Sequence, residues 1–132
     1  MAEIWSAENK VVLERELWIA VLVAQKDLGI KIDDAVVDAY RAVMTDVDLG
    51  SIDRRERVTL HDVKARIEEF SSLAGYEHIH KGLTSRDLTE NVEQLQIKRS
   101  LVLTQQRVVA VISRLAGLAI RYQETAITGR SH

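Results

Sequence analysis

The chain has 132 residues, with 18 lysines and arginines against 20 aspartates and glutamates, and it contains neither proline nor cysteine. This length suits one domain with a real core, and a chain without cysteine does not need an oxidising compartment. Acidic and basic residues are interspersed and the formal net charge is −2, which excludes the basic surface expected of a protein that binds nucleic acid or an anionic membrane.

No segment is expected to enter a membrane or to direct export. The first residues lack the pattern of a signal peptide, and the longest apolar stretch, 17–24, is far shorter than the roughly 18 to 20 residues that span a bilayer. The simplest expectation is a cytoplasmic protein without nucleic-acid or membrane partners. The absence of proline predicts long, uninterrupted helices and therefore an all-α fold.

Four helices are predicted before residue 76. The first begins after Ser6, a good N-cap, ends at Gly29, and is apolar around most of its circumference because charged residues at 14–16 interrupt one side only. A second helix is predicted over 33–44 and a short charged one over 52–58, separated by a loop over 45–51. The fourth is predicted to start at Thr59, its candidate cap, and to end at Gly75.

The last predicted helix, 86–122, is the longest, at roughly 55 Å. Its apolar residues recur at steps of three, four or seven along two separate stripes, which is typical of a helix in a bundle. A helix that is apolar on two faces needs more partner helices than this chain supplies. We therefore expect the missing partners to come from other subunits or from a C-terminal portion, and the end at His132 looks like a cut.

Three of the four histidines, His61, His78 and His80, lie near predicted helix ends, where an imidazole that titrates near neutral pH suits proton transfer. Gly82 predicts a tight turn, and Thr84 and Ser85 follow it at a helix start, with Ser85 as the natural N-cap. A helix start offers unpaired N–H groups to carboxylates and phosphates. The residues alone leave two interpretations open, simple caps or an anion-binding site.

Four segments together resemble the N-terminal part of adenylosuccinate lyase, a family of the fumarase/aspartase superfamily. Segment 4–10 resembles the opening helix of the family, His61-Asp62-Val63 its His-Asp-Val segment, and 80–87 its His-x-Gly-x-Thr-Ser-x-Asp segment. Segment 128–132 resembles its Gly-Arg-Thr-His segment, with Ser131 in place of the usual threonine. Each motif alone is weak, but their order along the whole chain is specific.

The resemblance implies a small helical domain over 1–90 and, over 91–132, the start of a central helical bundle. In this family the bundles of four identical subunits form a twenty-helix core, and active sites lie where three subunits meet. The implied reaction eliminates fumarate from adenylosuccinate to give AMP, and from SAICAR, the succinyl-carboxamide ribotide, to give AICAR. The resemblance implies neither a metal nor an organic cofactor.

The resemblance also assigns roles to individual residues. His132 matches the general acid of the family, and His61 and Asp62 match substrate-binding residues, with Leu60 contributing at most its backbone. The hydroxyls of Thr84 and Ser85 would stabilise the extra negative charge that develops on the substrate carboxylate. His80 and Lys81 would support the pocket. His78 has no counterpart, so a surface or packing role is expected.

Two familiar parts of the family pattern are missing. The general base is a serine in a Ser-Ser-x-Met-Pro-x-Lys-x-Asn loop that lies well beyond residue 132, and the Arg-Tyr segment that often precedes the first helix and contacts phosphate is absent. The expectation is therefore that this polypeptide alone is inactive.

Three other interpretations remain open from the sequence. A sister lyase, such as argininosuccinate lyase, aspartase or carboxymuconate cycloisomerase, shares the bundle and the class of mechanism. A non-catalytic helical assembly module would use its histidines only as helix caps. A metal site could be formed by His61, Asp62, His78 and His80, although the chain has no cysteine.

Overall fold

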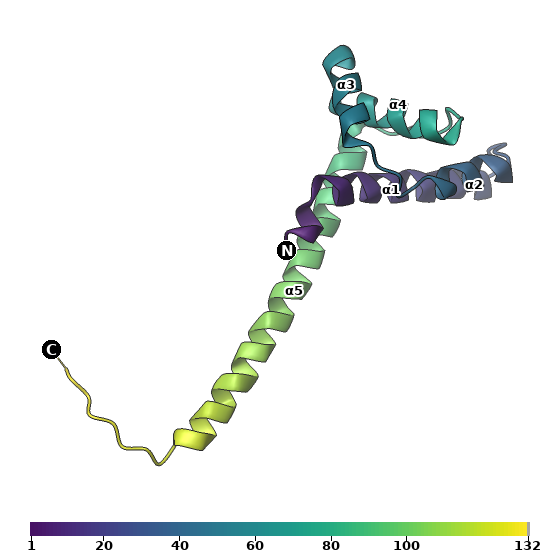
Figure 1. The fold of residues 1–132 in the computed structure, drawn as a ribbon. Coiled ribbons are helices and arrows are strands. Elements are labelled where there is room, and N and C mark those ends of the chain that lie inside the picture. Colours follow the sequence, from purple (N-terminus) through teal and green to yellow (C-terminus); the bar gives the residue numbers. More distant parts are fainter. Residues whose placement is uncertain (132) are drawn as a thin grey trace.

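The computed structural model describes residues 1–131, and every regular element in this range is helical. A short 3-10 helix, Glu3–Trp5, precedes α1 (Ala7–Asp27), α2 (Asp34–Ala42), α3 (Leu49–Thr59), α4 (Asp62–Ala74) and α5 (Ser85–Tyr122). In Figure 1 the four shorter α-helices gather around the beginning of α5, and the rest of α5 extends away from them as a single rod. The prediction of an all-α fold is confirmed.

Side-chain caps explain where the helices begin. Ser6 accepts a hydrogen bond from the Asn9 N–H at the start of α1, as predicted. Asp48 accepts a hydrogen bond from the Ser51 N–H, so α3 begins at Leu49. The loop predicted over 45–51 therefore ends three residues earlier than expected. The prediction that Thr59 caps α4 was wrong, because Thr59 is the last residue of α3 and His61 is the N-cap of α4.

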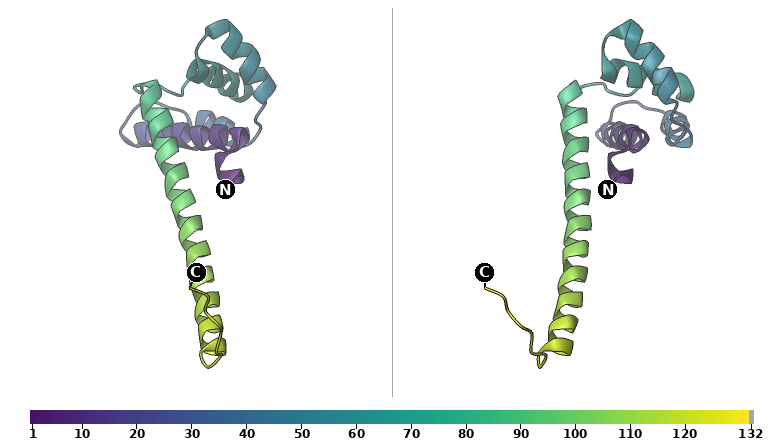
Figure 2. Two further views of the ribbon diagram at one scale, coloured as in Figure 1. Left: turned by 90° about the vertical axis from the view of Figure 1, so that its left-hand side faces the viewer. Right: turned by 60° about the vertical axis from the view of Figure 1, so that its left-hand side comes forward.

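The core lies between α1, α2, α4 and the first turns of α5. Trp18 of α1 stacks on Phe70 of α4 with ring centroids 6.2 Å apart, and Tyr40 of α2 packs on the same ring at 4.9 Å. Leu88 and Val92 join this core from α5. Figure 2 shows α1 crossing beside the upper part of α5, so the core fixes the start of α5 against the smaller helices.

Charged side chains are buried where the sequence predicted a solvent-facing side. Glu14 and Arg15, both on α1, are 0% exposed. Arg15 pairs with Glu69 of α4 at 2.5 Å and donates to the carbonyls of Val43 and Met44, at the end of α2. The charges at 14 and 15 therefore do not lie on the exposed side of α1. They tie α1 to α4, because long charged side chains reach across the interface.

Beyond its first three turns, α5 is exposed. Among its described residues only Leu88, Val92 and Gln96 are buried. An 18-residue window of α5 has a mean hydropathy of 1.2, so by length and composition this helix could cross a membrane. The prediction from the sequence considered only uninterrupted apolar stretches and did not indicate this. A helix covered on two faces in a soluble bundle has the same composition. The exposed apolar side chains are Ile97, Leu101, Val102, Val108, Val109, Val111, Ile112, Leu115, Leu118, Ile120 and Tyr122.

Candidate active site

The amino ends of α4 and α5 meet, and two of the predicted site residues come together there. Nε2 of His61 lies 3.5 Å from the hydroxyl oxygen of Ser85, although the two residues are 24 positions apart in sequence. The His61 side chain is 51% exposed, so a ligand can reach it. Two helix starts therefore present an imidazole and a hydroxyl to the same patch of solvent.

His61 has a structural duty as well. Its Nδ1 accepts the backbone N–H of Lys64 at 3.3 Å, which caps α4, and the Thr59 hydroxyl donates to the His61 carbonyl at 3.1 Å. Because Nδ1 accepts a hydrogen bond, the ring proton of the neutral imidazole lies on Nε2. The Nε2–H of His61 then points toward Ser85.

Leu60 separates α3 from α4 in the left-handed conformation, with a φ of 52°. This backbone conformation is unfavourable for a leucine. Leu60 is 88% exposed, so burial of its side chain in the described chain does not offset the cost of that conformation. The turn at Leu60 ends α3 and lets His61, the next residue, cap the start of α4. Leu60 thus contributes backbone geometry to this turn, and its predicted part in substrate binding stays a prediction.

Asp62 is held on two sides. Its Oδ2 accepts a hydrogen bond from Nη2 of Arg66 at 2.8 Å, and its Oδ1 lies 3.7 Å from Nδ1 of His61. Burial acts to raise the pKa of Asp62, but the hydrogen bonds from Arg66 and from the Val63 N–H outweigh it and hold the pKa below its usual value. Asp62 is therefore an ionised acceptor at neutral pH.

The start of α5 differs from the prediction, because Thr84 rather than Ser85 is the N-cap. The Thr84 hydroxyl accepts the Asp87 N–H at 3.3 Å and donates to Oδ2 of Asp87 at 3.0 Å, while the Thr84 N–H donates to the same oxygen at 2.7 Å. These bonds form a capping box and hold the pKa of Asp87 below its usual value. The hydroxyl of Ser85 and the N–H groups of Ser85 and Arg86 are left as donors toward a ligand.

His80 forms the floor of this region. Its backbone is left-handed, with a φ of 64°, and its Nδ1 accepts the indole N–H of Trp18 at 3.0 Å. Burial lowers the pKa of His80 against the opposing effect of Asp87, so the imidazole is neutral and carries its proton on Nε2. The carbonyl of Lys81 accepts from the Gln25 amide at 2.8 Å, which anchors the same turn to α1. The supporting role predicted for His80 and Lys81 at a substrate pocket stays a prediction.

Two other predicted residues lie apart from this group. His132, the predicted general acid, lies outside the described residues, so its placement stays a prediction. The His78 N–H donates to the Tyr40 hydroxyl at 3.2 Å, and its ring lies 6.4 Å from that of Tyr76, which fits a packing role. Among residues 1–131, no three His, Asp or Glu side chains are grouped so that they could hold a metal ion, which counts against the metal site considered above.

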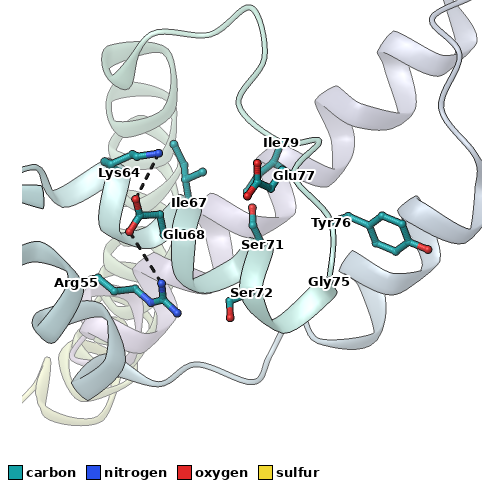
Figure 3. Close-up of a pocket in the computed structure, with 10 residues that line it drawn as sticks. All are labelled: Arg55, Lys64, Ile67, Glu68, Ser71, Ser72, Gly75, Tyr76, Glu77 and Ile79. Atoms are coloured by element: carbon teal, nitrogen blue, oxygen red, sulfur yellow. Dashed lines mark ion pairs between the residues drawn. The ribbon is translucent and has the colours of Figure 1, made fainter.

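A separate groove lies on a different surface. It is open, with a volume of about 630 Å³, and lies over α3, α4 and the segment after α4 (Figure 3). Glu68 in its wall is flanked by Lys64 at 3.4 Å and Arg55 at 3.9 Å. These charges are already paired, and neither His61 nor Ser85 lines the groove. The candidate site is therefore an open rim at two helix starts, separate from this groove.

Three residues that support the site were not predicted from the sequence. Asp87 could have been found, because Thr84-x-x-Asp87 has the spacing of a capping box, whereas Ser85 has no acidic partner three positions on. Arg66 lies four residues after Asp62 on a helix, a spacing at which ion pairs form. The contact of Trp18 with His80 had no local signal, because it joins residues 62 positions apart.

No family model matches the chain. Comparison with known proteins nevertheless finds relatives that align with the chain over its whole length. Adenylosuccinate lyase from Saccharomyces cerevisiae is 29% identical over 137 residues, covering 100% of this chain and 28% of that protein. Adenylosuccinate lyase from Methanothermobacter thermautotrophicus is 31% identical over 137 residues, covering 100% and 30%. N-acetyl-S-(2-succino)cysteine lyase from Dickeya dadantii is 30% identical over 138 residues, with the same coverage.

These relatives define the class: the chain is an all-helical relative of lyases in the fumarase/aspartase family. Within that class, it is a relative of the adenylosuccinate lyases and matches a fragment of that family. It spans less than a third of the length of each of these three relatives.

Proposed function

We propose that this chain forms the substrate-binding rim of an adenylosuccinate lyase. The assembled enzyme would eliminate fumarate from adenylosuccinate to give AMP, and from SAICAR to give AICAR, in purine nucleotide biosynthesis. The observation that carries the proposal is the meeting of His61 and Ser85 at 3.5 Å, at the starts of two helices. The similarity to adenylosuccinate lyases over the whole chain supports it.

The substrate suits the donors on this rim. A succinyl group carries two carboxylates, and breaking its C–N bond through a carbanion places further negative charge on one of them. The Ser85 hydroxyl and the N–H groups of Ser85 and Arg86 would donate to that carboxylate, at the positive end of α5. The Thr84 hydroxyl would serve mainly as a cap, since it already donates to Asp87. Lys81 would add positive charge.

The two residues at the start of α4 would bind the polar groups of the nucleotide. Asp62, as an ionised acceptor, would bind hydroxyl or N–H groups, and the Nε2–H of His61 would donate to a phosphate or carboxylate oxygen. His132 would act as the general acid that protonates the departing purine nitrogen. The general base would come from a segment outside residues 1–132, so the chain alone would release no fumarate.

The exposed apolar length of α5 fits the assembly that this function requires. Its side chains from Ile97 to Tyr122 are largely open to solvent, on more than one side of the helix. We propose that they pack into the bundle core of a homotetramer, in which neighbouring subunits complete each site. The enzyme would then work in the cytoplasm without a metal or an organic cofactor.

A titration of the labelled chain, assembled in the proposed homotetramer, with adenylosuccinate, followed by NMR, tests the proposal. The expected result is a selective, saturable shift of the His61 and Ser85 signals, with a weaker response to argininosuccinate, the substrate of a sister lyase. No shift at these residues with either compound would support a non-catalytic assembly module. A stronger response to argininosuccinate would reassign the substrate within the lyases.

A second candidate is a lyase that acts on another succinyl compound. The specific observation is the relative from Dickeya dadantii, whose name gives N-acetyl-S-(2-succino)cysteine as its substrate and which matches the chain about as well as the adenylosuccinate lyases do. Both substrates carry a succinyl group, so the carboxylate donors at Ser85 would serve either one. Including N-acetyl-S-(2-succino)cysteine in the same titration separates the two, because it lacks the nucleotide.

A further inference from the structure

Two buried arginine–glutamate pairs cross the interface between α1 and α4, and only one of them leads to the candidate site. Arg15 of α1 pairs with Glu69 of α4, and this pair is surrounded by the core. Glu14 of α1 pairs with Arg66 of α4, whose Nε lies 2.6 Å from a Glu14 carboxylate oxygen. Arg66 also reaches outward, because its Nη2 donates to Asp62 at 2.8 Å.

A continuous row of charged and polar groups therefore runs from the core to the rim. Glu14 is 0% exposed, and Arg66 is 9% exposed. Asp62 follows at the surface, with its Oδ2 bound to Arg66 and its Oδ1 3.7 Å from Nδ1 of His61. His61 completes the row toward Ser85 at 3.5 Å.

The two oxygens of Asp62 thus have different neighbours: Oδ2 binds Arg66, and Oδ1 lies near Nδ1 of His61. The Lys64 N–H donates to Nδ1 of His61, which requires a lone pair there. A carboxylate free to turn toward Nδ1 would favour a proton on that nitrogen instead. The guanidinium of Arg66 neutralises the Asp62 carboxylate and donates to one of its oxygens. On its buried side the same guanidinium forms an ion pair with Glu14.

We propose that Arg66, anchored by Glu14, is a positioning residue that holds Oδ1 of Asp62 beyond hydrogen-bond distance of Nδ1 of His61, at 3.7 Å, and so maintains the ring proton on Nε2, facing Ser85. The planar guanidinium suits this task, since it can bind a carboxylate on each of two sides, whereas the ammonium of a lysine is a single charged point. The relevance of this proposal to binding rests on the proposed function, but the proton position does not.

The test measures the protonated nitrogen of His61 in the full chain without any ligand. Two-bond 1H–15N correlation spectra of histidine-labelled protein, recorded at about pH 8.5 to favour neutral rings, distinguish Nδ1–H from Nε2–H. Wild type is expected to show Nε2–H at His61. Arg66→Gln is expected to move a large fraction of the proton to Nδ1. The matched control Arg15→Gln removes the other buried arginine and is expected to leave the His61 pattern unchanged.

A double variant distinguishes positioning from simple loss of structure. In Arg66→Gln combined with Asp62→Asn, the carboxylate that would attract the proton is gone, so the Nε2–H pattern is expected to return. Arg66→Lys, which keeps the charge if the glutamine variant does not fold, is expected to give an intermediate pattern. The proposal is overturned if folded Arg66→Gln and Arg66→Lys both keep the wild-type pattern, if Arg15→Gln changes it equally, or if the double variant does not restore it.

The outcome is independent of the nucleotide titration. A wild-type chain that ignores adenylosuccinate would count against the proposed function, while the proton position at His61 would still report on Arg66. If the chain binds the nucleotide but the Arg66 variants leave the proton position at His61 unchanged, the proposed function stands and the positioning role of Arg66 is refuted.

Discussion

The indole N–H of Trp18 donates to Nδ1 of His80 across 3.0 Å and connects the centre of the core to the floor of the candidate site. Trp18 is 1% exposed and stacks on Phe70, so its position is fixed by packing. The left-handed backbone at His80 therefore has a support that reaches from α1. Packing of the core and presentation of the site depend on the same side chain.

Trp18→Phe removes this hydrogen-bond donor and leaves a void beside His80. The pKa of His80 is expected to rise, because the indole N–H favours the neutral ring, and the chain is expected to lose about 1–3 kcal/mol of unfolding free energy. NMR titration and denaturant unfolding measure these two effects. Trp5→Phe is the control, since Trp5 is 48% exposed and donates only to Ser100. Equal losses in both variants would contradict the role given to Trp18.

The same histidine makes stability depend on pH. Because burial lowers the pKa of His80 from 6.5 in the folded chain, the unfolded chain binds the proton first as the pH falls. The contribution of His80 is therefore present above pH 6.5 and is lost as the pH falls through the folded pKa. His80→Gln is expected to flatten the stability profile in this range, and an unchanged profile would contradict a half-buried, neutral ring.

Glu14 acts in the opposite direction. Burial raises the pKa of Glu14 from 4.5 to about 7 against the attraction of Arg66 and Lys10, and the nearby Asp62 carboxylate adds a smaller effect in the same direction as burial. Its contribution to stability is fully present below pH 4.5 and is lost as the pH rises through about 7, by an amount on the order of 3 kcal/mol.

Glu14→Gln cannot ionise and is the test of this dependence. The unfolding free energy of wild type minus that of Glu14→Gln is expected to fall steadily between pH 4.5 and pH 7. Urea unfolding at several pH values measures the difference. Glu16→Gln is the control on the same helix, because Glu16 is exposed. A difference that is constant across this range would show that Glu14 stays ionised in the core.

Leu60→Gly is expected to stabilise the chain. Leu60 has a φ of 52° and is 88% exposed, so glycine relieves the left-handed backbone without removing a buried contact. The expected gain is about 1 kcal/mol of unfolding free energy. Leu60→Ala keeps a Cβ and is expected to give no comparable gain. Thermal unfolding separates them, and a loss of stability in Leu60→Gly would mean that the leucine side chain has a role of its own.

Capping and binding are separable at the start of α5. Thr84→Ala removes the capping box and is expected to cost about 1 kcal/mol of stability, whereas Thr84→Ser keeps the hydroxyl and most of the stability. Ser85→Ala is expected to cost less than Thr84→Ala while weakening the response to adenylosuccinate. Denaturant unfolding and ligand titration of the three variants provide the comparison. If Ser85→Ala destabilised more than Thr84→Ala, Ser85 would be the structural cap after all.

Local signals in the sequence predicted most helix limits. Ser6 and Gly75 mark the ends where the structure has them, because each acts on its own backbone neighbours. The start of α4 was missed for a physical reason: the cap is His61, whose imidazole nitrogen takes the place of the usual hydroxyl or carboxylate oxygen. Because Ser85 rather than Thr84 was predicted as the N-cap of α5, the capping box between Thr84 and Asp87 was not predicted.

The sequence pointed to residues that the structure places close together, but not to the residues that support them. The resemblance singled out His61, Asp62 and Ser85, and the structure brings His61 and Ser85 to 3.5 Å. Arg66 and Glu14 escaped prediction because isolated charges on a helix usually face water, and only the tertiary packing of α1 on α4 buries them.

The most direct measurement of the central claim is the affinity of adenylosuccinate for three forms of the chain, by isothermal titration calorimetry. His61→Ala is expected to weaken binding at least about tenfold, or about 1.4 kcal/mol, because it removes the imidazole between the starts of α4 and α5. His78→Ala, which removes a histidine at a packing position, is expected to bind like wild type. Equal affinity in wild type and His61→Ala, or loss of binding only in His78→Ala, would contradict a succinyl-nucleotide site at this rim.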